Sequence, residues 1–242
     1  KTVKKFKRMY SLVSILGSGY IEMNNFDYGP IFSTFGYNEV EGVRLRVGGR
    51  TYFGPNDTWR LQGYTAYGFD DNKFKYGLSG KWMIDKKNRF IISGGNRRDV
   101  EQIGASLTTT NDVLGRSYAS SGLFTTGSNG KLTNINLSTI EAEIEPIKNL
   151  SFQIGFSYRT LASASETFSL DYFTDDTFTT IKSEVKQSEI NLQLEFTPNR
   201  KTIGYGVERR EVNSPYSRVF INYSSGFKGL FGSDFDYHKL QL

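Results

Sequence analysis

Cysteine is absent from the 242-residue chain, and histidine occurs once, as His238. Without cysteine the chain cannot form a disulfide framework, a thiolate zinc site or a cysteine nucleophile. One histidine also excludes metal sites and catalytic networks that need two imidazoles. No apolar run reaches the roughly eighteen residues that a transmembrane helix needs. A transmembrane β-barrel stays open, because its strands are only half apolar and leave no hydropathy peak.

Neither sign of charge dominates: 30 Lys and Arg stand against 25 Asp and Glu, for a net charge of +5. Aromatic residues make up 15% of the chain, which is too much core-forming material for a disordered protein. Basic residues alternate with apolar ones instead of gathering in one exposed patch. We therefore expect no nucleic-acid partner.

The two ends of the chain differ in pattern from the middle. Residues 1–8 are basic, but the stretch after them is short, interrupted and lacks a small-residue cleavage site. We interpret residues 1–18 as a basic lead-in segment rather than a signal peptide, with residues 19–242 as one partial barrel. Residues 235–242 alternate as a strand does and stop without a turn. We therefore expect the chain to be a piece of a longer protein.

The dominant pattern in between has a period of two. From residue 73 to residue 85, aromatic and aliphatic residues alternate with lysine, glycine and serine, and Met83 is the one apolar exception. Residues 150–160 and 188–197 repeat the alternation. Successive side chains of a strand point to opposite faces, so each segment has one apolar and one polar face. The pattern predicts an all-β fold.

The connections favour an antiparallel transmembrane barrel. Strands of about ten residues, with short turns at one end and long loops at the other, are typical of outer-membrane barrels. Tyr, Trp and Phe near the strand ends match the aromatic girdles at the two membrane boundaries. The alternative is a soluble β-core whose ends these rings plug. The expected tight turns are 54–57, 70–72, 86–88, 148–149 and 198–200, and the expected long polar stretches are 99–130, 161–180 and 208–214.

In a barrel, the apolar face of each strand meets lipid and the polar face lines the lumen. The lipid-facing candidates are Phe74, Tyr76, Leu78, Trp82, Phe152, Ile154, Phe156, Ile190, Leu192 and Leu194. The lumen-facing basic candidates are Arg44, Arg46, Arg50, Arg60, Lys73, Lys75 and Lys81. Such a wall can attract anions or a plug segment. The simpler interpretation is that these charges pair with acidic residues on neighbouring strands, and Glu141, Glu143 and Glu145 are available on one face.

Four stretches carry a resemblance to a known family. They are residues 19–52 (GYIEMNNFDYGPIFSTFGYNEVEGVRLRVGGRTY), 59–77 (WRLQGYTAYGFDDNKFKYG), 96–104 (NRRDVEQIG) and 217–227 (SRVFINYSSGF). Together they resemble an outer-membrane barrel family of unknown function from Bacteroidota, distantly similar to the BamA/TamA superfamily. Members usually carry a carboxypeptidase-regulatory-like domain at the N-terminus.

The resemblance implies a closed barrel of about sixteen strands, of which this chain supplies about ten. It also implies a location in the outer membrane of a Gram-negative bacterium of the Bacteroidota type. One feature departs from the superfamily: no Arg-Gly pair followed by Phe or Tyr occurs in the chain. This departure weakens the inference of an assembly factor.

The remaining motifs point to no catalytic residues, no metal and no cofactor. His238 lies in a predicted strand, and its sequence neighbours offer no partner signature for acid–base work. Asp171, Asp175 and Asp176 lack the spacing of an EF-hand calcium loop. The glycine pairs 48–49 and 94–95 precede no helix, so they predict strand bends or close backbone approach rather than a phosphate site.

We therefore expect a non-enzymatic barrel of the BamA/TamA type that assists the assembly, insertion or transport of envelope components. The expected partners are outer-membrane lipid and other outer-membrane or periplasmic proteins. A scaffold or accessory subunit of an outer-membrane complex is the first alternative. A soluble β-rich binding module is the second. The sequence identifies neither the client nor the ligand.

Overall fold

The structure is a computed structural model that describes residues 15, 19–102, 132–165, 168–174, 177–212 and 215–242. In this part of the chain, twelve strands form one antiparallel sheet and two short hairpins stand apart from it. The predicted all-β, antiparallel class is confirmed. None of the helices in the described ranges is long and apolar enough to cross a membrane. The expected lead-in segment falls mostly outside the described residues.

The main sheet follows the chain as a meander. Its order is β1-β2-β4-β5-β6-β7-β8-β9-β12-β15-β16, and β3 pairs with the first half of β4. These strands are β1 (Ile21–Met23), β2 (Phe26–Tyr28), β3 (Phe35–Asn38), β4 (Gly42–Thr51), β5 (Trp59–Gly68), β6 (Lys73–Asp85), β7 (Phe90–Gln102), β8 (Leu132–Ile147), β9 (Leu150–Ser163), β12 (Glu184–Phe196), β15 (Val219–Gly226) and β16 (Tyr237–Gln241). The separate hairpins are β10 (Tyr172–Phe173) with β11 (Ile181–Lys182), and β13 (Thr202–Ile203) with β14 (Arg210–Glu211).

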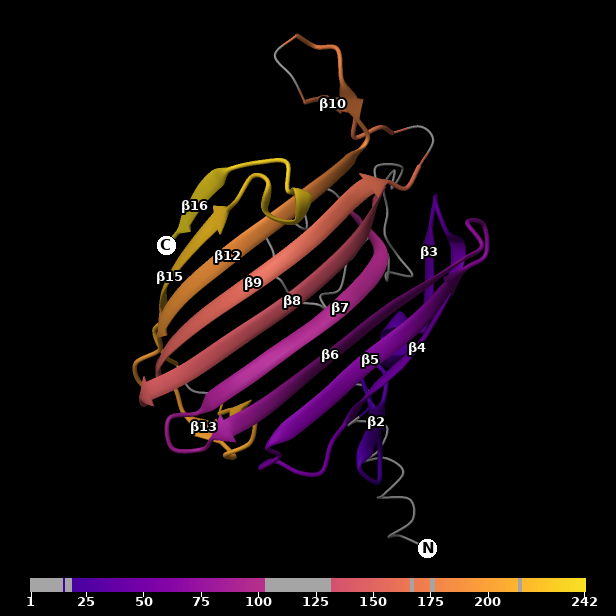
Figure 1. The fold of residues 1–242 in the computed structure, drawn as a ribbon. Helices are drawn as coiled ribbons and strands as arrows, with labels where there is room; N and C mark the ends of the chain where they lie inside the picture. The colour runs from indigo at the N-terminus through magenta and orange to yellow at the C-terminus, as the bar shows by residue number, and fades with distance from the viewer. Residues whose placement is uncertain (1–14, 16–18, 103–131, 166–167, 175–176, 213–214) are drawn as a thin grey trace, which may run out of the picture.

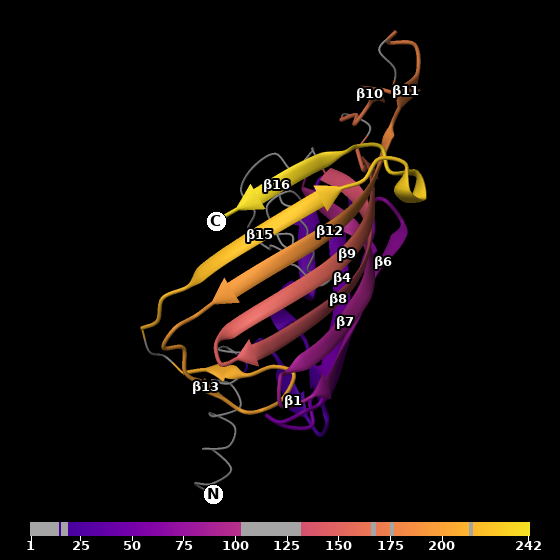
Figure 2. The same cartoon turned by 60° about the vertical axis from the view of Figure 1, so that its left-hand side comes forward.

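The sheet is strongly curved but not closed (Figures 1 and 2). Its two edges are β1 and β16, which do not pair with each other. The resemblance implied about ten strands in this chain, and the sheet has twelve. The short strands β1, β2 and β3 have three or four residues each, too few to show an alternating pattern.

The burial of the two faces is inverted relative to a soluble sheet. In β4, Arg44 and Arg46 are buried, whereas Val43, Leu45 and Val47, which alternate with them, are exposed. Arg44 is 2% exposed, and Phe74 on the neighbouring apolar row is 72% exposed. Curvature crowds the side chains on the concave face and spreads those on the convex face. The buried polar rows therefore lie on the concave face, and the apolar rows lie on the convex face.

Apolar clusters on the buried side are small. One contains Met83, Ile91 and Val207, and the other joins Val100 to Leu132. Most large apolar side chains of the sheet are instead exposed. Burial of apolar side chains against a second layer thus contributes little to the stability of the described sheet. Backbone hydrogen bonds and polar side-chain contacts hold these strands together instead.

One connection contradicts the expected difference between the two ends. Residues 197–218 join β12 to β15 at the end that also carries the tight turns 86–89 and 148–149. We expected a tight turn at 198–200 and a separate long polar stretch at 208–214. The connection instead folds back to the β4–β5 turn, where the Gly206 and Val207 N–H groups donate to the carbonyls of Pro55 and Asp57 (3.2 and 2.7 Å). This short-turn end is therefore partly covered by the chain itself.

At the opposite end, the β10–β11 hairpin projects beyond the sheet (Figures 1 and 2). Asp234, in the β15–β16 connection, ties this region together. Its carboxylate accepts hydrogen bonds from Lys182 Nζ (2.8 Å) and from the Lys186 N–H (2.7 Å). Burial raises the pKa of Asp234, but hydrogen bonds from Lys182, Lys186 and Tyr172 outweigh burial and leave the pKa below its ordinary value.

This lowered pKa makes the anchoring of the hairpin sensitive to acid. A carboxyl whose pKa is lower in the folded state stabilises that state above its unfolded pKa of about 3.9. The contribution is lost as the pH falls from there through the folded pKa. We expect the protection factors of the β10–β11 amides, which correct for the intrinsic pH dependence of hydrogen exchange, to fall on acidification through this window. In Asp234→Asn the protection factors should be low already at neutral pH and change little in acid. Asp171→Asn, an exposed control, should behave like the wild type; a wild-type pH response in Asp234→Asn would contradict the assignment.

Candidate functional site

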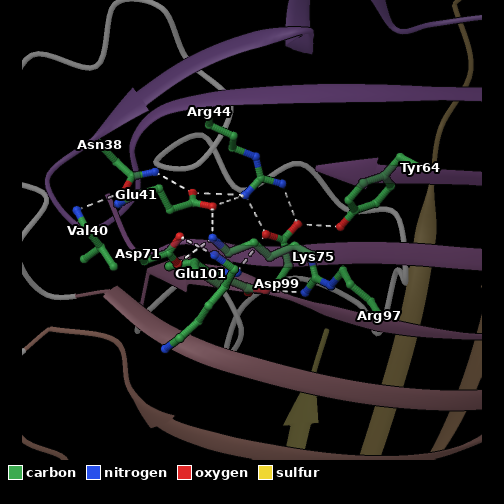
Figure 3. Close-up of polar contacts among 12 residues, drawn as sticks. Asn38, Val40, Glu41, Arg44, Tyr64, Asp71, Lys75, Arg97, Asp99 and Glu101 are labelled. Carbon is green, nitrogen blue, oxygen red and sulfur yellow. Dashed lines mark hydrogen bonds and ion pairs between the residues drawn. The ribbon is translucent and has the colours of Figure 1, made fainter. Parts of the chain in front are cut away.

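A buried ionic network occupies the concave face near the end that carries the β3–β4 and β5–β6 turns (Figure 3). Arg44 of β4 is its centre. The guanidinium donates from Nη1 and Nη2 to the two carboxylate oxygens of Asp99 on β7, at 2.7 and 3.0 Å. Nη1 also lies 3.0 Å from both carboxylate oxygens of Glu41, in the β3–β4 turn. This bidentate geometry is the strongest form of Arg–carboxylate pairing.

A lysine extends the network to a third strand. Lys75 of β6 places Nζ 2.6 Å from Glu41 and 2.5 Å from Asp71. Asn38 holds Glu41 in position, since its Nδ2 donates to the carboxylate (2.6 Å) and its Oδ1 accepts from the Glu41 N–H (2.8 Å). The turn thus aims one carboxylate at two cations from different strands.

An aromatic side chain from β5 completes the arrangement. The Tyr64 hydroxyl donates to Asp99 at 2.5 Å. The Arg46 guanidinium lies over the Tyr64 ring, 3.7 Å from its centroid, in a cation–π contact. The ring itself covers Gly77 of β6, where the Cβ of any other residue would overlap it. A second buried pair, Arg97 with Glu101, lies on the same strand as Asp99.

The network is electrically balanced and its contacts are mutual. Arg44, Arg46, Lys75 and Arg97 oppose Glu41, Asp71, Asp99 and Glu101. A group of three or more His, Cys, Asp or Glu suited to a metal ion does not occur in the described ranges. The geometry fits cross-linking of strands better than binding of a free ion.

The structure separates the lumen-facing basic candidates into three groups. Arg44, Arg46 and Lys75 join the network. Arg60 lies at the short-turn end, where it pairs with Glu208 and lies 3.6 Å from Asp57. Arg50 is partly exposed and pairs with Asp27 (3.1 Å). Lys73 is exposed at the start of β6, and Lys81 is half-exposed on the same strand.

The acidic partners are mostly not those that the sequence suggested. Glu145 pairs with Arg89 and Arg209 of the short-turn end, and not with any of the seven lumen-facing basic candidates. The decisive acids, Glu41 and Asp99, were missed. Asp99 was placed at the start of a long loop over 99–130, but β7 continues to Gln102. Its polar side chains are buried on the concave face, so the strand has no apolar run to reveal it.

All ten lipid-facing candidates lie on the convex face. Their registers agree across strands: Leu192 lies beside both Ile154 and Tyr223, and Leu194 lies beside Phe152. Phe74, Tyr76, Leu78, Trp82, Phe152, Ile154 and Leu192 are exposed, and Phe156, Ile190 and Leu194 are half-buried.

His238 acquires neighbours that the sequence did not indicate. Its Nδ1 lies 2.8 Å from the Tyr223 hydroxyl and 3.1 Å from Ser225 Oγ, and its ring stacks on Tyr223. Both hydroxyls share one ring nitrogen, and in the described part of the chain no carboxylate contacts the imidazole. The contacts orient the histidine on the sheet but do not assemble a nucleophile, base and orienting acid.

The other weak motifs are placed as follows. Asp171 is exposed, and Asp175 and Asp176 lie outside the described residues. Gly48 and Gly95 lie within strands, where an added Cβ would come within 2.8 and 2.5 Å of a neighbouring backbone oxygen. Close backbone approach, as predicted, is therefore their role.

Comparison with known proteins gives one match. A family model described as the C-terminal domain of a family of unknown function (DUF5686) matches residues 16–242. No curated protein and no solved structure matches the chain.

The contact between Tyr64 and Gly77 yields a test of the network. Gly77→Ala places a Cβ in the Tyr64 ring, so the ring must move and its hydrogen bond to Asp99 must break. We expect a loss of about 1–3 kcal/mol in the free energy of unfolding, measured by urea titration. Gly80→Ala is the matched control on the same strand, because the nearest atoms lie 3.8 Å from its Cβ. Equal stability of the two variants would contradict the contact.

Removal of the Asp99 carboxylate tests the centre of the network. Asp99→Ala leaves Arg44 with Glu41 alone and leaves the Tyr64 hydroxyl without its acceptor. Breaking a buried ion pair from one side costs about 3–5 kcal/mol. Arg218→Ala breaks an exposed pair with Glu195 and should cost less than about 1 kcal/mol. If urea midpoints shift equally in both variants, the network does not hold the sheet.

Proposed function

The chain belongs to the DUF5686 C-terminal domain family, and we propose that it forms part of the wall of an outer-membrane β-barrel without enzymatic activity. The observation that carries this proposal is the inverted burial of the sheet. Paired charges fill the concave face, and aliphatic and aromatic side chains cover the convex face. A monomeric soluble protein rarely exposes an apolar surface across so many strands. A lipid bilayer is the environment in which that surface is stable.

Aromatic clusters at both ends of the β5–β6 hairpin support a membrane band. At the short-turn end Trp59 lies opposite Trp82 and packs on Phe53, with ring centroids 5.0 Å apart. At the other end Tyr67 packs on Phe69 and Phe74, at 5.3 and 4.8 Å.

The spacing of the two clusters suits a bilayer. Trp59 and Tyr67 are eight residues apart, which is about 27 Å along a strand. A tilt of about 40° reduces this to roughly 20 Å along the membrane normal, near the apolar band of about 25 Å in outer-membrane barrels.

The two unpaired edges of the sheet, β1 and β16, would need partners in a membrane. An unpaired strand edge in hydrocarbon leaves backbone N–H and C=O groups without partners. We propose that strands beyond this twelve-stranded sheet close the barrel, in keeping with the about sixteen strands that the resemblance implies. We propose further that this barrel is of the BamA/TamA type.

Within that barrel, the preferred role is assistance in the assembly, insertion or transport of envelope components. Its support is the resemblance to the BamA/TamA superfamily. In such a barrel, an unpaired strand edge would offer a site where a client strand adds by backbone pairing. A scaffold role is the second candidate, and the β13–β14 hairpin favours it. Tyr205 on this hairpin is 81% exposed at the short-turn end, where a periplasmic partner would dock.

Depletion of the full-length protein followed by quantitative outer-membrane proteomics separates the two roles. An assembly role predicts a fall in many barrels or surface lipoproteins. A scaffold role predicts the loss of one or two proteins that also co-purify with it. An unchanged outer-membrane proteome would contradict both. Recovery of the protein in a urea-extractable fraction, with no change of gel mobility on boiling, would contradict the membrane barrel itself.

The proposed facing of the strands predicts unequal tolerance to charge. Ile154 lies on the convex face and its neighbour Gln153 lies on the concave face. An arginine on the lipid face costs about 2–4 kcal/mol near the bilayer midplane. We expect Ile154→Arg to lower the yield of folded, heat-modifiable protein in vesicles strongly, while Gln153→Arg folds like the wild type. Equal folding of the two variants would contradict a lipid-facing convex surface.

A further inference from the structure

The convex face contains an apolar groove of about 430 Å³. Side chains from β7, β8, β9, β12 and β15 line it, which makes it a feature of the sheet rather than of a loop. Most of the lining is apolar, including Phe90, Ala142, Ile154 and Leu192, and Glu143 is among the polar lining residues.

Two features of β8 account for the hollow. Ala142 lies beside Ile92 on one neighbouring strand and Ile154 on the other, so a methyl group stands where the adjacent rows carry larger side chains. The pairing of β8 with β9 also shifts register between Ile144 and Ile147. A bulge of this kind bends its strand and changes the direction of the side chains.

Basic residues lie just beyond the groove, at the short-turn end. Lys86 and Lys87 occupy the β6–β7 turn, three to four residues before Phe90, and Lys148 occupies the β8–β9 turn. The two turns are adjacent, because the Glu145 N–H donates to the Asn88 carbonyl at 2.7 Å. All three lysines are exposed, and none forms a salt bridge in the part of the chain that the structure describes, although the Asp85 carboxylate attracts the charge of Lys87.

Two acidic groups near these turns are engaged by other partners. Asp85 accepts hydrogen bonds from the backbone N–H groups of Lys87 and Asn88. Glu145 pairs with Arg89 and Arg209. The three ammonium groups therefore keep their charge available to an external anion.

We propose that this surface binds an anionic glycerophospholipid, with one acyl chain in the groove and the phosphate at the lysines of the two turns. The inference rests on the proposed membrane barrel, because only there does the convex face meet lipid. Short turns of outer-membrane barrels face the periplasm, so the lipid belongs to the periplasmic leaflet. The apolar groove and the lysines lie next to each other, just as the acyl chain and the phosphate head group do in a phospholipid.

Native mass spectrometry of the full-length protein, released from detergent with added lipid, tests the proposal. The probes are dioleoyl phosphatidylglycerol and dioleoyl phosphatidylcholine, which share acyl chains and differ in head-group charge. The wild type should retain one phosphatidylglycerol in preference to phosphatidylcholine. Ala142→Trp fills the groove and should lose both lipids, while Leu78→Trp, on the convex face outside the groove, should retain them.

Charge is tested separately from shape. Lys87→Gln with Lys148→Gln should reduce retention of phosphatidylglycerol by about fivefold per lysine and leave phosphatidylcholine unchanged. Lys73→Gln with Lys228→Gln removes two exposed lysines elsewhere and should have no effect. If Ala142→Trp does not fold, Ala142→Leu replaces it.

The outcomes distinguish this inference from the proposed function. Equal retention of the two lipids by the wild type, or undiminished retention by the groove and lysine variants, overturns the lipid site. The barrel proposal survives either result if the protein still inserts into vesicles with a heat-dependent gel shift. Failure of the wild type to insert overturns both.

Discussion

The Arg44 guanidinium is the centre of a set of side-chain contacts that link one turn and four strands. It binds Asp99 on β7 and Glu41 in the β3–β4 turn, and these two carboxylates in turn bind Tyr64 on β5 and Lys75 on β6. Each of these strands is already paired to its neighbour through the backbone, but backbone pairing alone leaves curvature soft. Side-chain contacts that skip strands, such as that from β4 to β7, resist flattening. The concave shape and the sidedness of the sheet therefore depend on this centre.

Inverted burial follows from the same arrangement. A two-residue period sends every second side chain to the concave face, where curvature removes water from it. Polar groups placed there must find partners, because burial of an unpaired charge is costly. Within the described residues, no second layer packs on the apolar rows. They need an apolar surrounding instead, and the proposed bilayer supplies it without any change in the pairing of the strands.

The sequence predicted the strands well where one face is apolar, as in 73–85 and 150–160. There the alternation depends only on local chemistry. It missed the last part of β7, from Asp99 to Gln102, because a strand segment whose concave side chains are charged has the same composition as a polar loop. It also missed the path of residues 197–218, whose contacts with Pro55 and Asp57 join parts of the chain far apart in sequence. The sequence also did not identify the acidic partners of the buried arginines. Pairing between β4 and β7 depends on the curvature of the sheet, and no local sequence pattern shows that curvature.

Most of the buried basic residues are arginines, although Lys75 is also buried and Arg218 is exposed. Arg44, Arg60, Arg89 and Arg209 point inward, and each meets a carboxylate of this chain. The planar guanidinium forms several directed hydrogen bonds at once and tolerates burial, so it suits these fixed partners. Lys86, Lys87 and Lys148 are exposed on turns, where a compact, hydrated ammonium on a flexible stem can follow a partner that is not fixed in place. The internal charges thus serve the shape of the wall, and the exposed lysines of the two turns beside the convex groove supply charge for the proposed lipid.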